Sequence, residues 1–307
     1  MNDQFLIRIA TRTSQLAIWQ SNLVASLLRE RQPEVQVELV KVVTEGDRKI
    51  DTPLSKIGGK SLFIKELEVA MLDGRADIAV HSMKDIPNQL PDQFSIMAIL
   101  KREDFRDVLL SQEGYTLANL PVGAVVGTSS LRRKSQLLSL RPDLLIRDLR
   151  GNVPTRVAKQ KNGDFDAIVL ASAGLRRLGL YDSAAYGLSV GEVMPAVGQG
   201  AIGIEALTKD QNLRNLVRGL NNDLSAQEVF AERAFSRYLN GSCQSAIGAL
   251  AQTQGADLML EGIVASPDGR QIIRKNTCGS LRDPEEVGNK LGRLMREAGA
   301  DELLKLS

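Results

Sequence analysis

The sequence contains few of the residues on which histidine and cysteine chemistry depends. It has one histidine, His81, and two cysteines, Cys243 and Cys278, among 307 residues. Two cysteines so far apart fit neither a disulfide framework nor a zinc site. A metal site built from several histidines is impossible, so we expect no bound metal. A Ser–His or Cys–His catalytic pair would have to use His81, and proton transfer falls more readily to Asp, Glu or Lys.

Aromatic residues, an excess of charge and long apolar runs are also lacking. Aromatic residues make up 4% of the chain and the formal net charge is +2, which argues against stacking on bases and against a general attraction to nucleic acids or membranes. No apolar run reaches the length of a membrane span, and residues 1–10 lack the composition of a signal peptide. We therefore expect a cytoplasmic protein, or a plastid-like location if a transit peptide was removed. The near-neutral surface favours a monomer.

What the sequence does contain is typical of a globular protein of two or three domains, with 43% hydrophobic and 25% charged residues. Its first part alternates strand and helix patterns. Residues 5–10 and 35–43 read as strands around a helix at 15–30, a β-α-β unit of a parallel sheet. Further strands are predicted at 77–80, 123–126, 144–149 and 166–170, with helices at 61–72 and 131–140 and another that contains Arg156. The shared spacing of residues 74–80 and 163–169 indicates two related β/α domains.

The pattern changes towards the C-terminus. Residues 202–206 read as a strand that returns to the first domain. A helix at 226–239 then precedes three antiparallel strands at 247–253, 258–265 and 270–278, and a helix at 284–298 closes the chain. We therefore predict an α/β protein with a third, small α+β domain that has a three-stranded antiparallel sheet. The predicted boundaries are 1–100 with 200–220, 101–199, and 221–307.

Polar residues follow several predicted strands, at the edge where open α/β sheets bind ligands. Arg12 and Ser14 lie at the start of a helix, which favours an anion, although Arg12 could equally be a solvated arginine. Asp85 follows the strand at 77–80 together with Ser82 and Lys84. The arginines placed after strands in the second half are Arg132, Arg133, Arg150, Arg156, Arg176 and Arg177. Because guanidinium groups match carboxylates and phosphates, this pattern favours a polyanion-binding cleft between the two β/α domains.

Two loops remain open to two interpretations each. Residues 48–60 have no period and contain Gly58-Gly59 and several cations, so they form either a mobile lid or an ordinary solvated loop. The loop at 239–249 holds Cys243 together with two glycines, Gly241 and Gly248. Cys243 is either a covalent attachment point or a small, partly buried cysteine in a tight turn.

From about Ile7 to Leu304 the chain resembles the porphobilinogen deaminases, also called hydroxymethylbilane synthases. The motifs that carry the resemblance are Ile9-Ala10-Thr11-Arg12 with Ser14, Gly58-Gly59-Lys60 with Phe63, His81-Ser82-Met83-Lys84-Asp85, Gly127-Thr128-Ser129-Ser130-Leu131-Arg132-Arg133, Arg150-Gly151-Asn152, Gly198-Gln199-Gly200 and Cys243-Gln244. Each motif alone is weak, but together and in this order they are specific.

The resemblance implies two domains like periplasmic binding proteins and a third domain that bears the cysteine. It implies a transferase that joins four porphobilinogens head to tail, releasing ammonia, on a dipyrromethane primer bound to Cys243 by a thioether. Water finally frees hydroxymethylbilane. By the same resemblance Asp85 is the catalytic carboxylate. The residues assigned to the cofactor are Cys243, Ser82, Lys84, Thr128, Ser130, Arg132, Arg133 and Arg156. Those assigned to the substrate or the growing chain are Arg12, Ser14, Arg150, Arg177 and Gln199, and those of the mobile loop are Asp47, Lys56 and Lys60.

Two positions depart from the family pattern. Ser242 stands where a glycine is usual, so a positive φ there would be strained. Ala246 stands where a proline is usual, which loosens the unfolded chain slightly. The alternatives are a non-catalytic two-domain anion-binding module or an inactive relative, which the fold alone permits. A nucleic-acid-binding protein is disfavoured by the composition.

Overall fold

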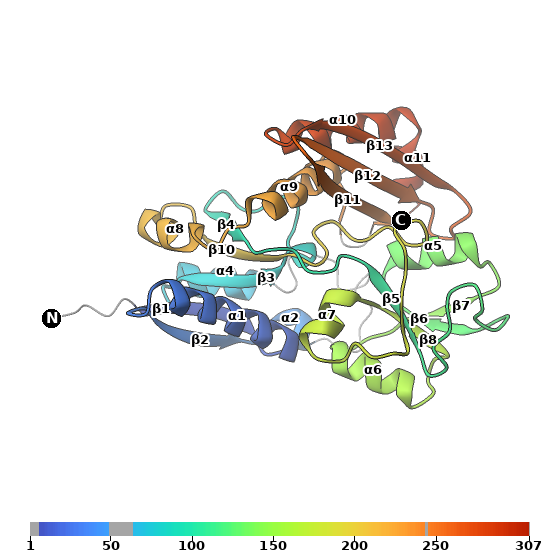
Figure 1. Cartoon of the computed structure of the whole chain (residues 1–307), viewed down its shortest axis with the longest axis horizontal. Coiled ribbons are helices and arrows are strands. Elements are labelled where there is room, and N and C mark those ends of the chain that lie inside the picture. The colour runs from blue at the N-terminus through green and yellow to red at the C-terminus, as the bar shows by residue number, and fades with distance from the viewer. Residues whose placement is uncertain (1–5, 49–63, 243–244, 307) are drawn as a thin grey trace. The chain divides into compact units, whose positions relative to one another are not determined.

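The computed structural model describes residues 6–48, 64–242 and 245–306 (Figure 1). These residues form two compact units, 1–102 with 201–226 and 103–200 with 227–307. The first unit is therefore built from two separate stretches of chain. This agrees with the prediction that a strand at 202–206 returns to the first domain. The three-domain boundaries expected from the sequence stay a prediction.

The first unit has a five-stranded sheet in the order β2-β1-β3-β10-β4. Its strands are β1 (Leu6–Arg12), β2 (Gln36–Val42), β3 (Ile78–Ser82), β10 (Ile202–Leu207) and β4 (Phe94–Ile99). Strand β1 runs parallel to β2 and β3, but β10 runs antiparallel to both β3 and β4. The predicted β-α-β unit is confirmed by the parallel pairing of β1 and β2. The predicted returning strand is β10, which re-enters the sheet after the chain has passed through the second unit.

Helices cover both faces of this sheet. The helices are α1 (Gln15–Arg31), α2 (Glu45–Arg48), α4 (Lys65–Leu72) and α8 (Gln211–Arg218), with a 3-10 turn, η1 (Met83–Asp85). Alternate residues of a strand point to opposite faces. Accordingly, Ile7 and Ile9 pack in one core cluster with residues of α1 and α8, whereas Ala10 packs in another with Leu67 of α4. The carboxyl ends of β1 and β3 thus lie between two helical layers.

The second unit repeats this plan. Its first sheet has the order β7-β6-β8-β5-β9, in which β6 runs parallel to β7 and β8, and β5 runs antiparallel to β8 and β9. Its strands are β5 (Asp107–Ser111), β6 (Val125–Gly127), β7 (Leu145–Arg147), β8 (Ala167–Ala171) and β9 (Ala185–Gly187), and its helices are α5 (Leu131–Leu140), α6 (Val153–Lys161) and α7 (Ser172–Arg177). The prediction of two related β/α domains is confirmed by this shared strand order.

The C-terminal part of the second unit is the predicted antiparallel meander. It contains β11 (Ile247–Gln254), β12 (Asp257–Ala265) and β13 (Ile272–Ser280), with helices α9 (Asp223–Tyr238), α10 (Pro284–Glu297) and α11 (Ala300–Leu304). Helix α10 approaches α9 closely at Gly288, where a Cβ atom would lie 2.4 Å from the carbonyl oxygen of Ala231. Across the described residues, no helix is both long and apolar enough to span a bilayer.

Candidate active site

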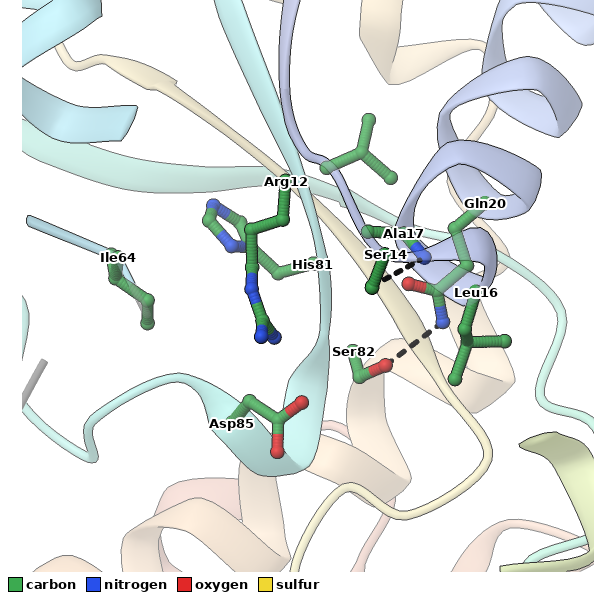
Figure 2. A pocket seen from close by; sticks show the side chains of 10 residues that line it. Arg12, Ser14, Leu16, Ala17, Gln20, Ile64, His81, Ser82 and Asp85 are labelled. Carbon is green, nitrogen blue, oxygen red and sulfur yellow. Dashed lines mark hydrogen bonds between the residues drawn. The ribbon is translucent and has the colours of Figure 1, made fainter. Parts of the chain in front are cut away.

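A pocket opens in the first unit where β1 and β3 end and α1 begins (Figure 2). The residues that line it are Arg12, Ser14, Leu16, Ala17, Gln20, Ile64, Val80, His81, Ser82 and Asp85. Asp85 is exposed and lies in η1, directly after β3. Figure 2 shows the side chains of Arg12 and Asp85 extending into the same space. The structure therefore brings together four of the predicted site residues, Arg12, Ser14, Ser82 and Asp85, which come from two separate stretches of chain.

Arg12 is held in place by Asp47, which lies in α2. Nε of Arg12 donates a 3.2 Å hydrogen bond to Asp47, and its Nη2 makes a second, very short contact with the other carboxylate oxygen. The hydroxyl of Thr44 donates to the same carboxylate at 2.8 Å. Burial alone would raise the pKa of Asp47, but the hydrogen bonds from Arg12 and Thr44 outweigh it and lower that pKa. Asp47 is therefore ionised near neutral pH and orients the guanidinium.

The start of α1 gives the pocket a fixed wall of donors. Ser14 is the N-cap, and its hydroxyl accepts from the amide of Ala17 at 3.3 Å. The first turn carries no acidic residue, so the positive end of the helix dipole is not neutralised within α1. On the next turn, the amide of Gln20 donates to the hydroxyl of Ser82 at 2.8 Å and ties α1 to the end of β3. This wall suits a carboxylate ligand.

Behind the pocket lies a buried acidic cluster that no pattern in the sequence predicts. Nε2 of His81 is 2.8 Å from Oε2 of Glu205, and the Glu205 side chain is fully buried on β10. Glu68 of α4 is almost as buried, and its pKa is raised by burial and by the charge of Glu205, against the effect of His81. His81, expected to be a packed histidine, thus packs against a carboxylate and also contributes to the pocket wall.

In the second unit, two of the predicted arginines turn inward. Arg132 and Arg133 begin α5 and are 4% and 6% exposed, and both contact the fully buried Asp107 of β5. Burial would raise the pKa of Asp107, but the charges of Arg132 and Arg133 outweigh it and hold that pKa well below its usual range. The three side chains together carry one excess positive charge. Among the described residues, buried Nε of Arg133 has no hydrogen-bond partner. An excess cation with an unused donor fits an anionic group.

Two other predicted arginines of this unit, Arg156 and Arg177, hydrogen-bond to backbone carbonyls. Arg156 donates to the carbonyl of Gly151 at 2.7 Å, and Arg177 donates to the carbonyl of Gly200 at 2.6 Å. Burial lowers the pKa of Arg177 to about 10. Thr128 is buried and accepts from the amide of Ser130, the N-cap of α5, at 3.2 Å. Arg150 is partly buried, as is Lys84 of the first unit.

Gln199, predicted to meet the substrate, is fully buried. Its side-chain amide donates to the carbonyl of Phe105 at 2.7 Å and to Asp107 at 2.9 Å. The polyanion cleft expected between the two β/α domains stays a prediction. Cys243, Lys56 and Lys60 lie outside the described residues.

Ser242, beside Cys243, does not adopt the positive φ that would strain a serine. The left-handed non-glycine residue of the described chain is Asn240, with φ +54°, and not Ser242. The strain anticipated at Ser242 is thus absent, because the chain turns two residues earlier, at a residue type that tolerates this conformation. Gly241 then passes so close to α9 that a Cβ atom would lie 2.7 Å from the Ser236 hydroxyl oxygen. Ala246 is fully buried.

Comparison with protein families decides what this architecture is. Residues 7–215 match the porphobilinogen deaminase dipyrromethane cofactor-binding domain, and residues 226–297 match the porphobilinogen deaminase C-terminal domain. The chain belongs to the porphobilinogen deaminase family. It is therefore a hydroxymethylbilane synthase, a transferase of tetrapyrrole biosynthesis that uses porphobilinogen and a dipyrromethane cofactor. The expected family, fold, activity and cofactor are confirmed.

The chain is also distantly similar to solved structures of binding proteins. The periplasmic aliphatic sulphonate binding protein SsuA from Escherichia coli is 14% identical, with 76% of this chain and 70% of that chain covered at a TM-score of 0.40. A TRAP periplasmic solute binding protein from Ralstonia eutropha is 13% identical, with 76% and 79% covered at a TM-score of 0.43. No functional conclusion rests on similarities this distant.

Proposed function

We propose that Asp85 is the carboxylate with which this porphobilinogen deaminase acts on its substrate, and that the pocket around it is the substrate site. One observation carries the proposal. Asp85 is an exposed carboxylate at the carboxyl end of a central strand, in a pocket whose wall includes Arg12 and the N-terminus of α1. The carboxylate of Asp85, which would face the reacting pyrrole ring, thus lies next to Arg12 and the start of α1, which would bind the carboxylates of the substrate.

Arg12 and Ser14 are suited to the carboxylates of porphobilinogen. Each substrate molecule carries an acetate and a propionate, and a guanidinium fork binds a carboxylate with two hydrogen bonds. Arg12 is already oriented by Asp47, so little side-chain entropy is lost when a substrate binds. The start of α1 offers a second anion position.

Asp85 has two tasks that one carboxyl group can perform in turn. Positive charge develops on the pyrrole nitrogen as ammonia leaves and as the new carbon–carbon bond forms, and an adjacent carboxylate stabilises that charge. In its protonated form the same group gives a proton to the departing amine. Removing such a group typically lowers the rate by roughly 10²–10⁴-fold.

We further propose that one dipyrromethane per chain is attached to Cys243 by a thioether. When bound, the cofactor supplies the terminal pyrrole to which substrate units are added. Helix α9 ends shortly before Cys243 in the sequence. The excess positive charge of the Arg132–Arg133–Asp107 cluster suits the carboxylates of the cofactor. The other residues proposed to hold the cofactor are Ser82, Lys84, Thr128, Ser130 and Arg156. Arg150, Arg177 and Gln199 are proposed for the substrate or the growing chain, and Asp47, Lys56 and Lys60 for the mobile loop.

We also propose that the enzyme works as a cytoplasmic monomer without nucleic-acid or membrane partners. The near-neutral net charge of +2 supports this. No observation favours the alternative of a non-catalytic anion-binding module.

Intact-mass measurement and turnover together test the proposed function. The wild type is expected to be heavier than its sequence by two linked pyrrole units, and Cys243→Ser is expected to match its sequence. Asp85→Asn should keep the added mass and lose turnover of porphobilinogen by roughly 10²–10⁴-fold. Asp92→Asn, which removes an exposed carboxylate from the same unit, should retain turnover. An unmodified wild type from cells that make porphobilinogen, or an active Asp85→Asn, would contradict the proposal.

A further inference from the structure

The two arginines at the start of α5 share one buried carboxylate. Oδ1 of Asp107 accepts from Nη2 of Arg133 at 2.7 Å, and Oδ2 lies 2.8 Å from Nη1 of Arg132. Asp107 begins β5 and has no exposed surface. The directions of both guanidinium groups are therefore fixed from inside the protein.

No neutral side chain of the same shape can replace this carboxylate. Oδ1 of Asp107 accepts from Arg133 and Gln199, while Oδ2 faces Arg132. An asparagine has one oxygen and one amino group. Whichever way it turned, its amino group would point at an N–H donor, and one arginine would lose its acceptor.

The same network fastens the arginines to the segment at 194–199. Nη1 of Arg132 donates to the carbonyl of Met194 at 2.5 Å, and Gln136 of α5 both donates to that carbonyl and accepts from the Met194 amide. At the other end of the segment, Gln199 donates to Asp107. Both ends of this segment are thus tied to the arginine cluster.

Glu232 extends the connection to α9. Its fully buried carboxylate accepts from the amide of Gly198 at 2.7 Å and from the amide of Ala251 at 2.9 Å. Glu232 lies on α9, the helix that ends just before the loop with Cys243. Buried hydrogen bonds, linked through the backbone between Gly198 and Gln199, therefore connect the proposed cofactor arginines to the helix that precedes Cys243.

We propose that Asp107 is a positioning residue for the dipyrromethane cofactor: it sets the directions of Arg132 and Arg133 and, through Gln199 and Glu232, ties them to the helix before Cys243. This inference rests on the proposed attachment of the cofactor to Cys243. Asp107 does not touch the cofactor in this proposal. It acts by keeping two carboxylate-binding groups in one arrangement relative to the thiol.

Cofactor loading, followed by mass, tests the role of Asp107 without relying on turnover. Wild type and Asp107→Asn are produced in cells that make no porphobilinogen, incubated with porphobilinogen, and weighed intact over time. We expect Asp107→Asn to gain the mass of the cofactor at least roughly tenfold more slowly, as for other lost residues that orient a binding group. Two controls separate this from a general loss of stability. Leu117→Ala removes a buried core side chain of the same unit, and Asp143→Asn breaks the Arg141–Asp143 pair elsewhere in it.

The outcomes are distinct. If Asp107→Asn loads slowly while a Leu117→Ala protein of equal or lower thermal midpoint loads normally, the positioning role is supported. If both load at the same rate, Asp107 is only structural and the inference is wrong. If Asp107→Asn does not fold, Glu232→Gln is tested in the same assay, because it weakens the other end of the network. Slow loading of Glu232→Gln supports the inference, and normal loading overturns it. If the wild type gains no mass, the proposed function itself fails.

Discussion

Arg8 and Arg12 lie four residues apart on β1, and each pairs with an aspartate, but of the two Arg12 lines the pocket. Arg12 pairs with Asp47, and Arg8 donates to Asp77 at 2.7 Å and 3.0 Å. The two aspartate side chains are 17% and 26% exposed. Asp47→Asn and Asp77→Asn are therefore matched perturbations of two similar ion pairs, of which one orients a proposed substrate ligand.

The expected effect follows from the exposure of the pairs. A charge-assisted hydrogen bond is worth about 1.5–3 kcal/mol when buried, and exposed ion pairs are worth about 0.2–1 kcal/mol. For these partly exposed pairs we expect each substitution to remove about 1 kcal/mol of interaction free energy. In Asp47→Asn this loss should raise KM for porphobilinogen roughly fivefold with little change in kcat, because Arg12 keeps its charge and loses its orientation. Asp77→Asn should lower the free energy of unfolding by a similar amount and leave KM unchanged.

Acid pH adds a second readout for the same pair. The lowered pKa of Asp47 means that the pair stabilises the fold above the ordinary carboxyl pKa of 3.8, and this contribution disappears as the pH falls through the lowered pKa. The stability difference between wild type and Asp47→Asn should shrink accordingly. Steady-state kinetics and urea unfolding supply both measurements. Equal KM values for Asp47→Asn and Asp77→Asn would refute the view that Asp47 orients a substrate-binding arginine.

Three further predictions concern packing, charge and backbone conformation. Gly288→Ala places a Cβ atom 2.4 Å from the carbonyl oxygen of Ala231, so α9 and α10 must separate. Calorimetry should show a loss of about 1–3 kcal/mol in the free energy of unfolding. An unchanged thermal midpoint would contradict this. Glu68→Gln should stabilise the protein at neutral pH, because burial and the charge of Glu205 raise the pKa of Glu68. Wild-type stability must then fall as the pH rises above the ordinary value of 4.5, a fall that urea unfolding should not find in the variant. Asn240→Ala should cost roughly 1 kcal/mol at its left-handed φ, whereas Asn240→Gly should be nearly neutral in thermal unfolding; equal losses would contradict this explanation.

Much of the fold could be predicted because local signals agreed with it. The helix of α1 has its apolar period and its Ser14 cap, and the meander of the C-terminal part alternates clearly between short turns. Strands β4, β5 and β9 were missed. β5 is short and begins with Asp107, a residue type that disfavours a buried strand, and its charge is accommodated only by arginines distant in sequence.

The same reason explains what could not be predicted about the site. Motif spacing placed Arg12, Ser82 and Asp85 after strands, and the structure gathers them in one pocket. The inward direction of Arg132 and Arg133 depends on Asp107, which contributes no motif of its own. Likewise, Glu205 is one carboxylate in an apolar run, and nothing near it in sequence indicates that His81 will be its partner.

The insertion of β10 between β3 and β4 has a consequence for the order in which the protein can form. β4 ends at Ile99, and β10 begins at Ile202. At the usual pace of roughly 5–20 residues per second, a ribosome that has just finished β4 needs about 5–20 s more before the strand between β3 and β4 exists. During that time the nascent first unit has a vacant place in its sheet and two unpaired strand edges. The strands of the β7-β6-β8-β5-β9 sheet all lie between residues 107 and 187, so this sheet can be complete before the sheet that emerges first. The nascent chain must keep the open edges of the first sheet from pairing elsewhere until residues 202–207 arrive.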